Sequence, residues 1–201
     1  MLTAALFLAA LAAIVNADHR ITLRNNCDFG VGLTLSNFPH NGVDYMGAAI
    51  GDIAAHTSKD IIVPTRLDLM VLRMSTSHPK FQMEWRVVSA IALRVLAVIT
   101  TASEAVLAFG EAACSMTEWT FDSANIGGQN DYDISNIQGY SVPQQIIPDS
   151  GCSVVTCTSS GCPCDQAYRP GDTSGTCGGT GPVDQATRVC GTSGYTVVYC
   201  P

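Results

Sequence analysis

The stretch NDYDISNIQGYSVP (residues 130–143) places two carboxylates, Asp131 and Asp133, in an alternating polar and apolar run. In an extended strand, residues i and i+2 share a face, so both carboxylates face one side and Tyr132 and Ile134 face the other. Such a pair is either a solvated strand surface or one wall of an acidic cleft. Clustered carboxylates raise one another's pKa values, which is the property that acid–base chemistry needs.

The charge balance of the chain restricts its partners. The formal net charge is −7, with 10 basic and 17 acidic residues. Nucleic-acid backbones and anionic membranes both bind basic surfaces, so we expect no nucleic-acid partner and favour a neutral or cationic one. Nine cysteines are far too many for a reducing cytosol, and they predict disulfides in an oxidising compartment.

Metal and cofactor sites are not expected. Four cysteines cluster at positions 152, 157, 162 and 164, but their spacing is not the paired C-x2-C of structural zinc sites. No histidine follows His78, and the four histidines match no catalytic spacing. The Gly-rich run at 171–181 lacks the lysine and the following helix of a phosphate-binding loop.

The N-terminus predicts secretion. Residues 1–17 are an apolar run followed by small residues, Val15 and Ala17, at the usual cleavage positions, which predicts a signal peptide cut after Ala17. The alternative is an uncleaved anchor, but the run is shorter than the ~20 residues that a span needs. We therefore expect a secreted, extracellular monomer with no stable membrane span after cleavage.

Short strands and turns dominate both ends of the chain. Apolar residues alternate over 21–23 and 31–35, which predicts two strands around a turn that carries Cys27. The closing YTVVYCP reads as a terminal strand whose Cys200 can reach an N-terminal strand. From 110 to 201 the same pattern returns, with eight of the nine cysteines.

The segment from 65 to 109 differs from its surroundings. It holds five of the ten basic residues and no cysteine, and its second half is almost continuously apolar, with Arg94 and Glu104 inside. A mid-span arginine costs ~2.5 to 3.5 kcal/mol on insertion scales, so a membrane span is disfavoured. A buried or amphipathic helix is one alternative for this part.

Several motifs in order resemble the thaumatin-like family. They are the opening ITLRNNCDFGV (21–31), SMTEWTF (115–121), DYDISNIQGYSVP (131–143), GCSVVTC (151–157) and the closing VCGTSGYTVVYCP (189–201). The resemblance covers about 18–64 and 110–201. It fails over 65–109, which is either a genuine atypical insertion or a gene-model artefact such as a retained intron.

The resemblance implies an all-β fold, an antiparallel two-sheet sandwich or flattened barrel with a small disulfide-rich loop domain. The sandwich would comprise 18–151 and 185–201, and the disulfide-rich subdomain 152–184. The implied bridges are Cys27–Cys200, Cys152–Cys190 and Cys157–Cys177. Cys114, Cys162 and Cys164 are left without an assigned partner.

The resemblance also implies an acidic cleft that binds β-1,3-glucan or a related cell-wall polysaccharide. Its lining would include Glu118 and Asp133, with Gln138 in place of a family aspartate and Asp184 near the register of the last one. Tyr140 is a further candidate sugar contact, and Trp119 and Tyr132 either stack on sugars or fill the core. The family's cleft arginine would fall in 65–109, where Arg86 is the candidate.

Three functions stay open from the sequence. Glycoside cleavage needs one carboxylic acid to protonate the leaving oxygen and a second carboxylate as nucleophile or base, roles that Glu118 and Asp133 would take in a weak endo-β-1,3-glucanase. A binding protein with a defence or wall-remodelling role needs only the cleft. A protein-binding inhibitor or effector would leave the cleft idle.

Overall fold

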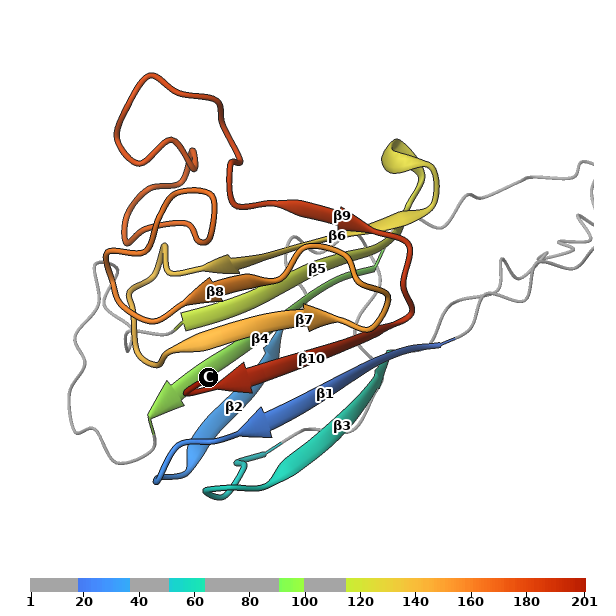
Figure 1. Cartoon of the computed structure of the whole chain (residues 1–201), viewed down its shortest axis with the longest axis vertical. Helices are drawn as coiled ribbons and strands as arrows, with labels where there is room; N and C mark the ends of the chain where they lie inside the picture. Colours follow the sequence, from blue (N-terminus) through green and yellow to red (C-terminus); the bar gives the residue numbers. More distant parts are fainter. Residues whose placement is uncertain (1–17, 37–50, 64–90, 100–114) are drawn as a thin grey trace, which may run out of the picture.

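The computed structural model describes residues 18–36, 51–63, 91–99 and 115–201, and within these ranges the chain forms two five-stranded sheets and no α-helix (Figure 1). Sheet A is ordered β3 (Ser58–Val63), β1 (His19–Asn25), β10 (Gly194–Tyr199), β7 (Gln144–Pro148) and β8 (Val155–Cys157). Sheet B is ordered β2 (Val31–Ser36), β4 (Ile91–Ile99), β5 (Ser115–Ser123), β6 (Gln129–Ser135) and β9 (Arg188–Cys190). A single 3-10 turn, η1 (Ala124–Ile126), joins β5 to β6.

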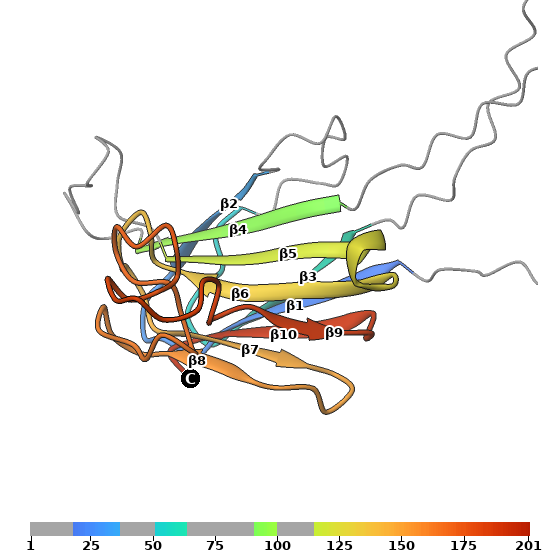
Figure 2. The same ribbon diagram turned by 90° about the horizontal axis from the view of Figure 1, so that it is seen from above.

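The expected all-β, two-sheet fold class is confirmed. In Figure 2, β2, β4 and β5 of sheet B lie on one side of the molecule and β7, β8 and β10 of sheet A on the other. Sheet B is antiparallel throughout, whereas in sheet A the first and last strands, β1 and β10, pair in parallel. The other pairs of sheet A are antiparallel, so β1 and β10 form the one parallel pair among the described strands of the expected antiparallel sandwich.

The core lies between the sheets and follows from the period-two pattern. In β1, Ile21 and Leu23 are fully buried, while Arg20 and Arg24 are exposed. Aromatic side chains meet in the middle of the sandwich: the rings of Trp119 and Tyr132 lie 6.0 and 5.3 Å from that of Tyr195. Trp119 and Tyr132 are at most 2% exposed, so they fill the core and are not available for stacking on a sugar.

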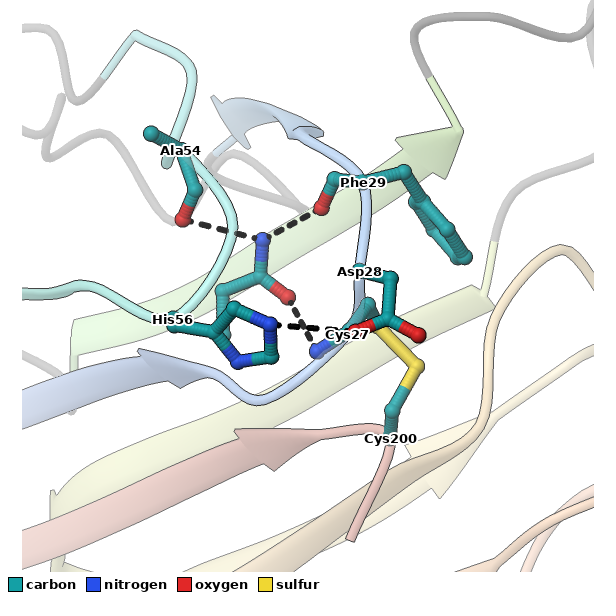
Figure 3. A network of polar contacts seen from close by, with 7 residues as sticks. Cys27, Asp28, Phe29, Ala54, His56 and Cys200 are labelled. Carbon is teal, nitrogen blue, oxygen red and sulfur yellow. Dashed lines mark hydrogen bonds and ion pairs between the residues drawn. A yellow bond between two sulfur atoms is a disulfide. The ribbon is translucent and has the colours of Figure 1, made fainter.

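The ends of β1 and β10 are joined covalently, as the resemblance implies. Cys27 is bonded to Cys200, with the two Cα atoms 5.2 Å apart (Figure 3). The buried Asn25 organises the same turn, because its amide nitrogen donates to the carbonyl oxygens of Phe29, at 2.8 Å, and Ala54, at 3.1 Å. Its Oδ1 accepts the backbone N–H of Cys27. The first and last strands are thereby fixed to each other and to the loop before β3.

The atypical segment contributes a central strand. Residues 91–99 form β4, which pairs with β2 on one side and β5 on the other. A helix is therefore the wrong expectation for these nine residues, since apolar runs of this length suit a buried strand as well as a helix and only pairing partners decide. Arg86 and the other residues of 65–90 and 100–109 lie outside the described residues.

A strand-poor loop, residues 158–187, lies at the end of the sheets where β6 finishes (Figure 1). The predicted Cys152–Cys190 bridge is present, but the predicted Cys157–Cys177 bridge is not. Instead, Cys157 pairs with Cys162 and Cys164 pairs with Cys177, with Cα separations of 5.5 and 5.9 Å. The chain turns back directly after β8, which brings Cys162 within bonding distance of Cys157. Cys114 lies outside the described residues.

Candidate functional site: opposed carboxylates at the end of sheet B

The two candidate catalytic carboxylates lie directly opposite each other. Glu118 on β5 and Asp133 on β6 are paired in register, and the next pair is Trp119 with Tyr132. Since successive residues of a strand alternate between faces, the buried Trp119–Tyr132 pair points into the core and the Glu118–Asp133 pair to the outer face of sheet B. Both acids are half-buried, and Oε1 of Glu118 and Oδ1 of Asp133 are shielded from solvent.

The neighbouring row on the same face holds Asp131. It is paired with Thr120 on β5 and with Val189 on β9, whose side chain is 47% exposed. Burial raises the pKa of Asp131 above its ordinary value, and hydrogen bonds from the hydroxyl and backbone of Thr120 partly oppose this rise. Asp131 and Asp133 thus share a half-buried outer face, as their spacing predicts.

A further carboxylate, Asp184, is held by a tyrosine from the loop. The hydroxyl of Tyr168 donates to Oδ1 of Asp184 at 2.7 Å and lies 3.1 Å from the hydroxyl of Thr187. Burial raises the pKa of Tyr168 far above its ordinary value, and the charges of Asp133 and Asp184 raise it further. Both carboxylates therefore lie within electrostatic range of the same phenol.

The backbone of Tyr168 joins the loop to the end of β6. Its N–H donates to the carbonyl of Ile134 at 3.0 Å, and its carbonyl accepts the N–H of Asn136 at 3.0 Å. These bonds form an isolated parallel bridge between Tyr168 and Ser135, two residues beyond Asp133. The sequence reading missed Tyr168, because a tyrosine in a disulfide-rich loop has no spacing that marks it as part of a site.

The other predicted contacts lie on the turn that follows β6. Gln138 and Tyr140 are both half-buried there, on either side of Gly139, whose φ is 112° and whose N–H donates to the carbonyl of Asn136. Tyr140 packs against the core cluster, and burial raises the pKa of its phenol. Gln138 and Tyr140 thus adjoin the strand that carries Asp133 without belonging to the Glu118–Asp133 row.

A basic residue occupies the register position next to Glu118. Arg94 on β4 is the Cα partner of Glu118, so Arg94, Glu118 and Asp133 form one row across three adjacent strands. The sequence reading named Arg86 for the cleft arginine and treated Arg94 only as an obstacle to a membrane span. The signal that distinguishes them is strand register, which follows only once residues 91–99 are known to pair with β5.

The fold and the site define a disulfide-linked, two-sheet β-protein with an acidic row on the outer face of one sheet. No family model matches the chain, and no curated protein matches it. Among solved structures, the thaumatin-like xylanase inhibitor TLXI matches with 14% identity and a TM-score of 0.48, over 90% of this chain and 99% of that one. The protein elicitor MoHrip2 from Magnaporthe oryzae matches with 14% identity and a TM-score of 0.47, over 91% and 99%.

Among the described residues, no three His, Cys, Asp or Glu side chains are grouped to hold a metal ion. In the same part of the chain, no helix has the length and apolar character to cross a membrane.

Proposed function

We propose that the chain is a secreted thaumatin-like protein that binds β-1,3-glucan or a related cell-wall polysaccharide on the outer face of sheet B. The observation that carries the proposal is the direct opposition of Glu118 and Asp133, half-buried on adjacent strands. Asp184, whose carboxylate accepts a hydrogen bond from Tyr168, would add a further acceptor from the loop. Four disulfides among the described residues suit an extracellular protein.

Carboxylates recognise a neutral sugar by accepting hydrogen bonds from its hydroxyl groups. Hydrogen bonds with one ionised partner are shorter and roughly twice as strong as neutral ones. A half-buried carboxylate is more effective than an exposed one, because fewer water molecules compete for its oxygens. Gln138 and Tyr140 on the following turn would supply neutral polar and apolar contacts to neighbouring sugar units.

Retention on insoluble β-1,3-glucan tests the proposal. The wild-type protein should be retained, and Glu118→Gln and Asp133→Asn should each weaken retention about tenfold, since each substitution removes a charged acceptor. Asp149→Asn is the matched control, because Asp149 is an exposed carboxylate at the end of sheet A, 3.8 Å from Arg20. Loss of retention in the control alone, or no retention of the wild type, would contradict the proposal.

Weak endo-β-1,3-glucanase activity is the second candidate, and the same opposition favours it. Directly opposed residues on antiparallel strands have Cβ atoms about 4.5–5.5 Å apart, which brings two carboxyl groups close together. Retaining glycosidases hold theirs ~5 to 5.5 Å apart, and inverting enzymes need ~6.5 to 9.5 Å. Glu118 would be the acid and Asp133 the nucleophile.

Reducing-sugar release separates the two candidates. Release by the wild type that is lost in both Glu118→Gln and Asp133→Asn would establish hydrolysis. Equal release by all three proteins would remove the enzyme candidate and leave binding. If the wild type neither binds nor cleaves the glucan, a protein-contact role as inhibitor or effector becomes the better account.

A further inference from the structure

The ring of Tyr168 is packed so closely that its position is defined on several sides. A Cβ added at Gly175 would lie 2.7 Å from Cε1 of Tyr168 and 3.0 Å from the backbone nitrogen of Asp184. Only a residue without a side chain allows this approach, and Gly175 also has a φ of 66°, where glycine carries no steric cost. The glycine therefore brings the tyrosine ring and the Asp184 backbone together.

Asp184 adopts a backbone conformation that needs support. Its φ is 53°, in the left-handed region that non-glycine residues enter at a cost. Its N–H donates to the carbonyl of Ser174 at 3.1 Å, and its carbonyl accepts the N–H of Thr187 at 3.1 Å. The Tyr168 hydroxyl completes this set by fixing the side chain, so the Asp184 carboxylate has one defined direction.

We propose that Tyr168 is a positioning residue of the glucan site. Its backbone docks the 158–187 loop onto the end of β6, and its hydroxyl orients the Asp184 carboxylate toward the sugar that Glu118 and Asp133 bind. This inference rests on the proposed function, and it names the group that makes the loop part of the site. Tyr168 acts on the ligand only through Asp184.

The phenol suits this role because it stays protonated. Its raised pKa keeps it a neutral donor throughout the pH range in which the carboxylates titrate, so Asp184 always has a donor to pair with. A lysine or arginine in its place would neutralise the carboxylate. The tyrosine orients the charge of Asp184 and leaves it available to accept hydrogen bonds from sugar hydroxyls.

A double-mutant cycle in the absence of ligand tests whether the Tyr168 hydroxyl and the Asp184 carboxylate interact. Tyr168→Phe removes the hydroxyl and keeps the ring, Asp184→Asn removes the charge, and the double variant combines them. If the hydroxyl and the carboxylate interact, the losses of unfolding stability are non-additive. Additive losses would show that the two groups do not interact, and they would overturn the inference without reference to any sugar.

The same four proteins are then titrated with a soluble linear β-1,3-glucan oligosaccharide. We expect about tenfold weaker binding for Tyr168→Phe, a similar loss for Asp184→Asn, and little further loss in the double variant. A merely structural role of Tyr168 would weaken binding equally with and without the Asp184 charge. Such additive losses of affinity, or unchanged affinity in Tyr168→Phe, would overturn the positioning role and leave the proposed function standing.

Two further variants keep the result interpretable. Tyr199→Phe is the matched control, because the Tyr199 hydroxyl is buried in the core and has no hydrogen-bond partner among the described residues. It should bind as the wild type does.

Gly175→Ala displaces the Tyr168 ring while keeping its hydroxyl, and it should weaken binding as Tyr168→Phe does. Wild-type affinity in Gly175→Ala would count against the inference. Failure of the wild type itself to bind would instead overturn the proposed function together with the inference.

Discussion

Nε2 of His19 lies 3.0 Å from Oδ2 of Asp122, and this contact joins the start of β1 in sheet A to the end of β5 in sheet B. The imidazole is 4% exposed and stacks on Phe121, with ring centroids 4.3 Å apart. Asp122 has a φ of 53°, and its backbone N–H donates to Oδ1 of Asn130. At the end of the sandwich opposite the 158–187 loop, the His19–Asp122 contact thus links the two layers together with the bond that the Asn130 amide donates to the hydroxyl of Tyr195 on β10, at 3.2 Å.

Asp122→Asn should lower the free energy of unfolding by about 1 kcal/mol, because it replaces a charged acceptor with a neutral one in a partly buried site. Asparagine tolerates positive φ at least as well as aspartate, so the backbone is preserved. Denaturant unfolding at neutral pH measures the effect. Asp122→Ala should cost more, since alanine has neither the acceptor nor the tolerance for this φ; equal stability of wild type and Asp122→Asn would contradict a role for the contact.

Val95→Pro should prevent folding of sheet B. Val95 lies in the middle of β4, in register with Leu35 on β2 and Thr117 on β5, so its backbone is paired on both sides. Proline removes a ladder donor, so it is confined to edge strands, strand starts and bulges and is not tolerated in the middle of a central strand. Val95→Thr keeps the amide and the branched shape and is the control. A Val95→Pro protein that unfolds cooperatively, with the stability of the wild type, would show that β4 is dispensable and that residues 91–99 are not part of the sheet.

Replacing the Cys27–Cys200 bridge with serines should destabilise the protein more than replacing Cys157–Cys162. The first closes a loop of 173 residues and the second a loop of 5. Loop-entropy models assign these about 5 and about 2 kcal/mol, respectively. Denaturant unfolding of the two double-serine variants measures the order. Non-reducing peptide mapping checks the pairing itself, and a Cys157–Cys177 peptide would contradict the connectivity described here.

Asp131→Asn should become more stable relative to the wild type as the pH rises. Burial raises the pKa of Asp131, so between the ordinary aspartate value and the raised value the folded state binds more protons than the unfolded state. Stability of the wild type therefore falls as the pH rises through that window, and the asparagine variant lacks this loss. Unfolding free energies of the wild type and of Asp131→Asn, measured from acid to neutral pH, give the difference in stability. A difference that does not change with pH would contradict the raised pKa of Asp131.

Alkaline pH should unfold the protein steeply, because several tyrosines are held neutral in the core. Burial raises the pKa of Tyr195 to about 12, and that of Tyr199 rises for the same reason. Stability is complete below the ordinary tyrosine pKa of about 10 and is lost as the pH rises toward the folded-state value. Phenolate absorbance and circular dichroism should change together above that point. Ionisation of all tyrosines with a single ordinary pKa in the folded protein would contradict the burial.

The sequence alone determined the features that depend on local pattern. Alternation in β1 and β6 assigns Ile21, Leu23 and Ile134 to the core and puts Asp131 and Asp133 together on the outer face, because successive side chains of a regular strand point to opposite faces. The Cys27–Cys200 bridge was accessible through the resemblance of the first and last strands to one family. Each of these follows from residues within one strand or from a motif at a chain end.

Only the tertiary structure decided which distant residues meet. The opposition of Glu118 and Asp133, the row that Arg94 joins and the contact of Tyr168 with Asp184 all depend on register between strands or on the path of a loop. The pairing of Cys157 with Cys162 also depends on the path of a loop. A disulfide forms only between cysteines that are close in space, and the spacing of cysteines in the sequence does not give that distance. Residues 91–99 form a strand because they pair with β2 on one side and β5 on the other. An apolar run in the sequence does not indicate which segments lie beside it in the fold.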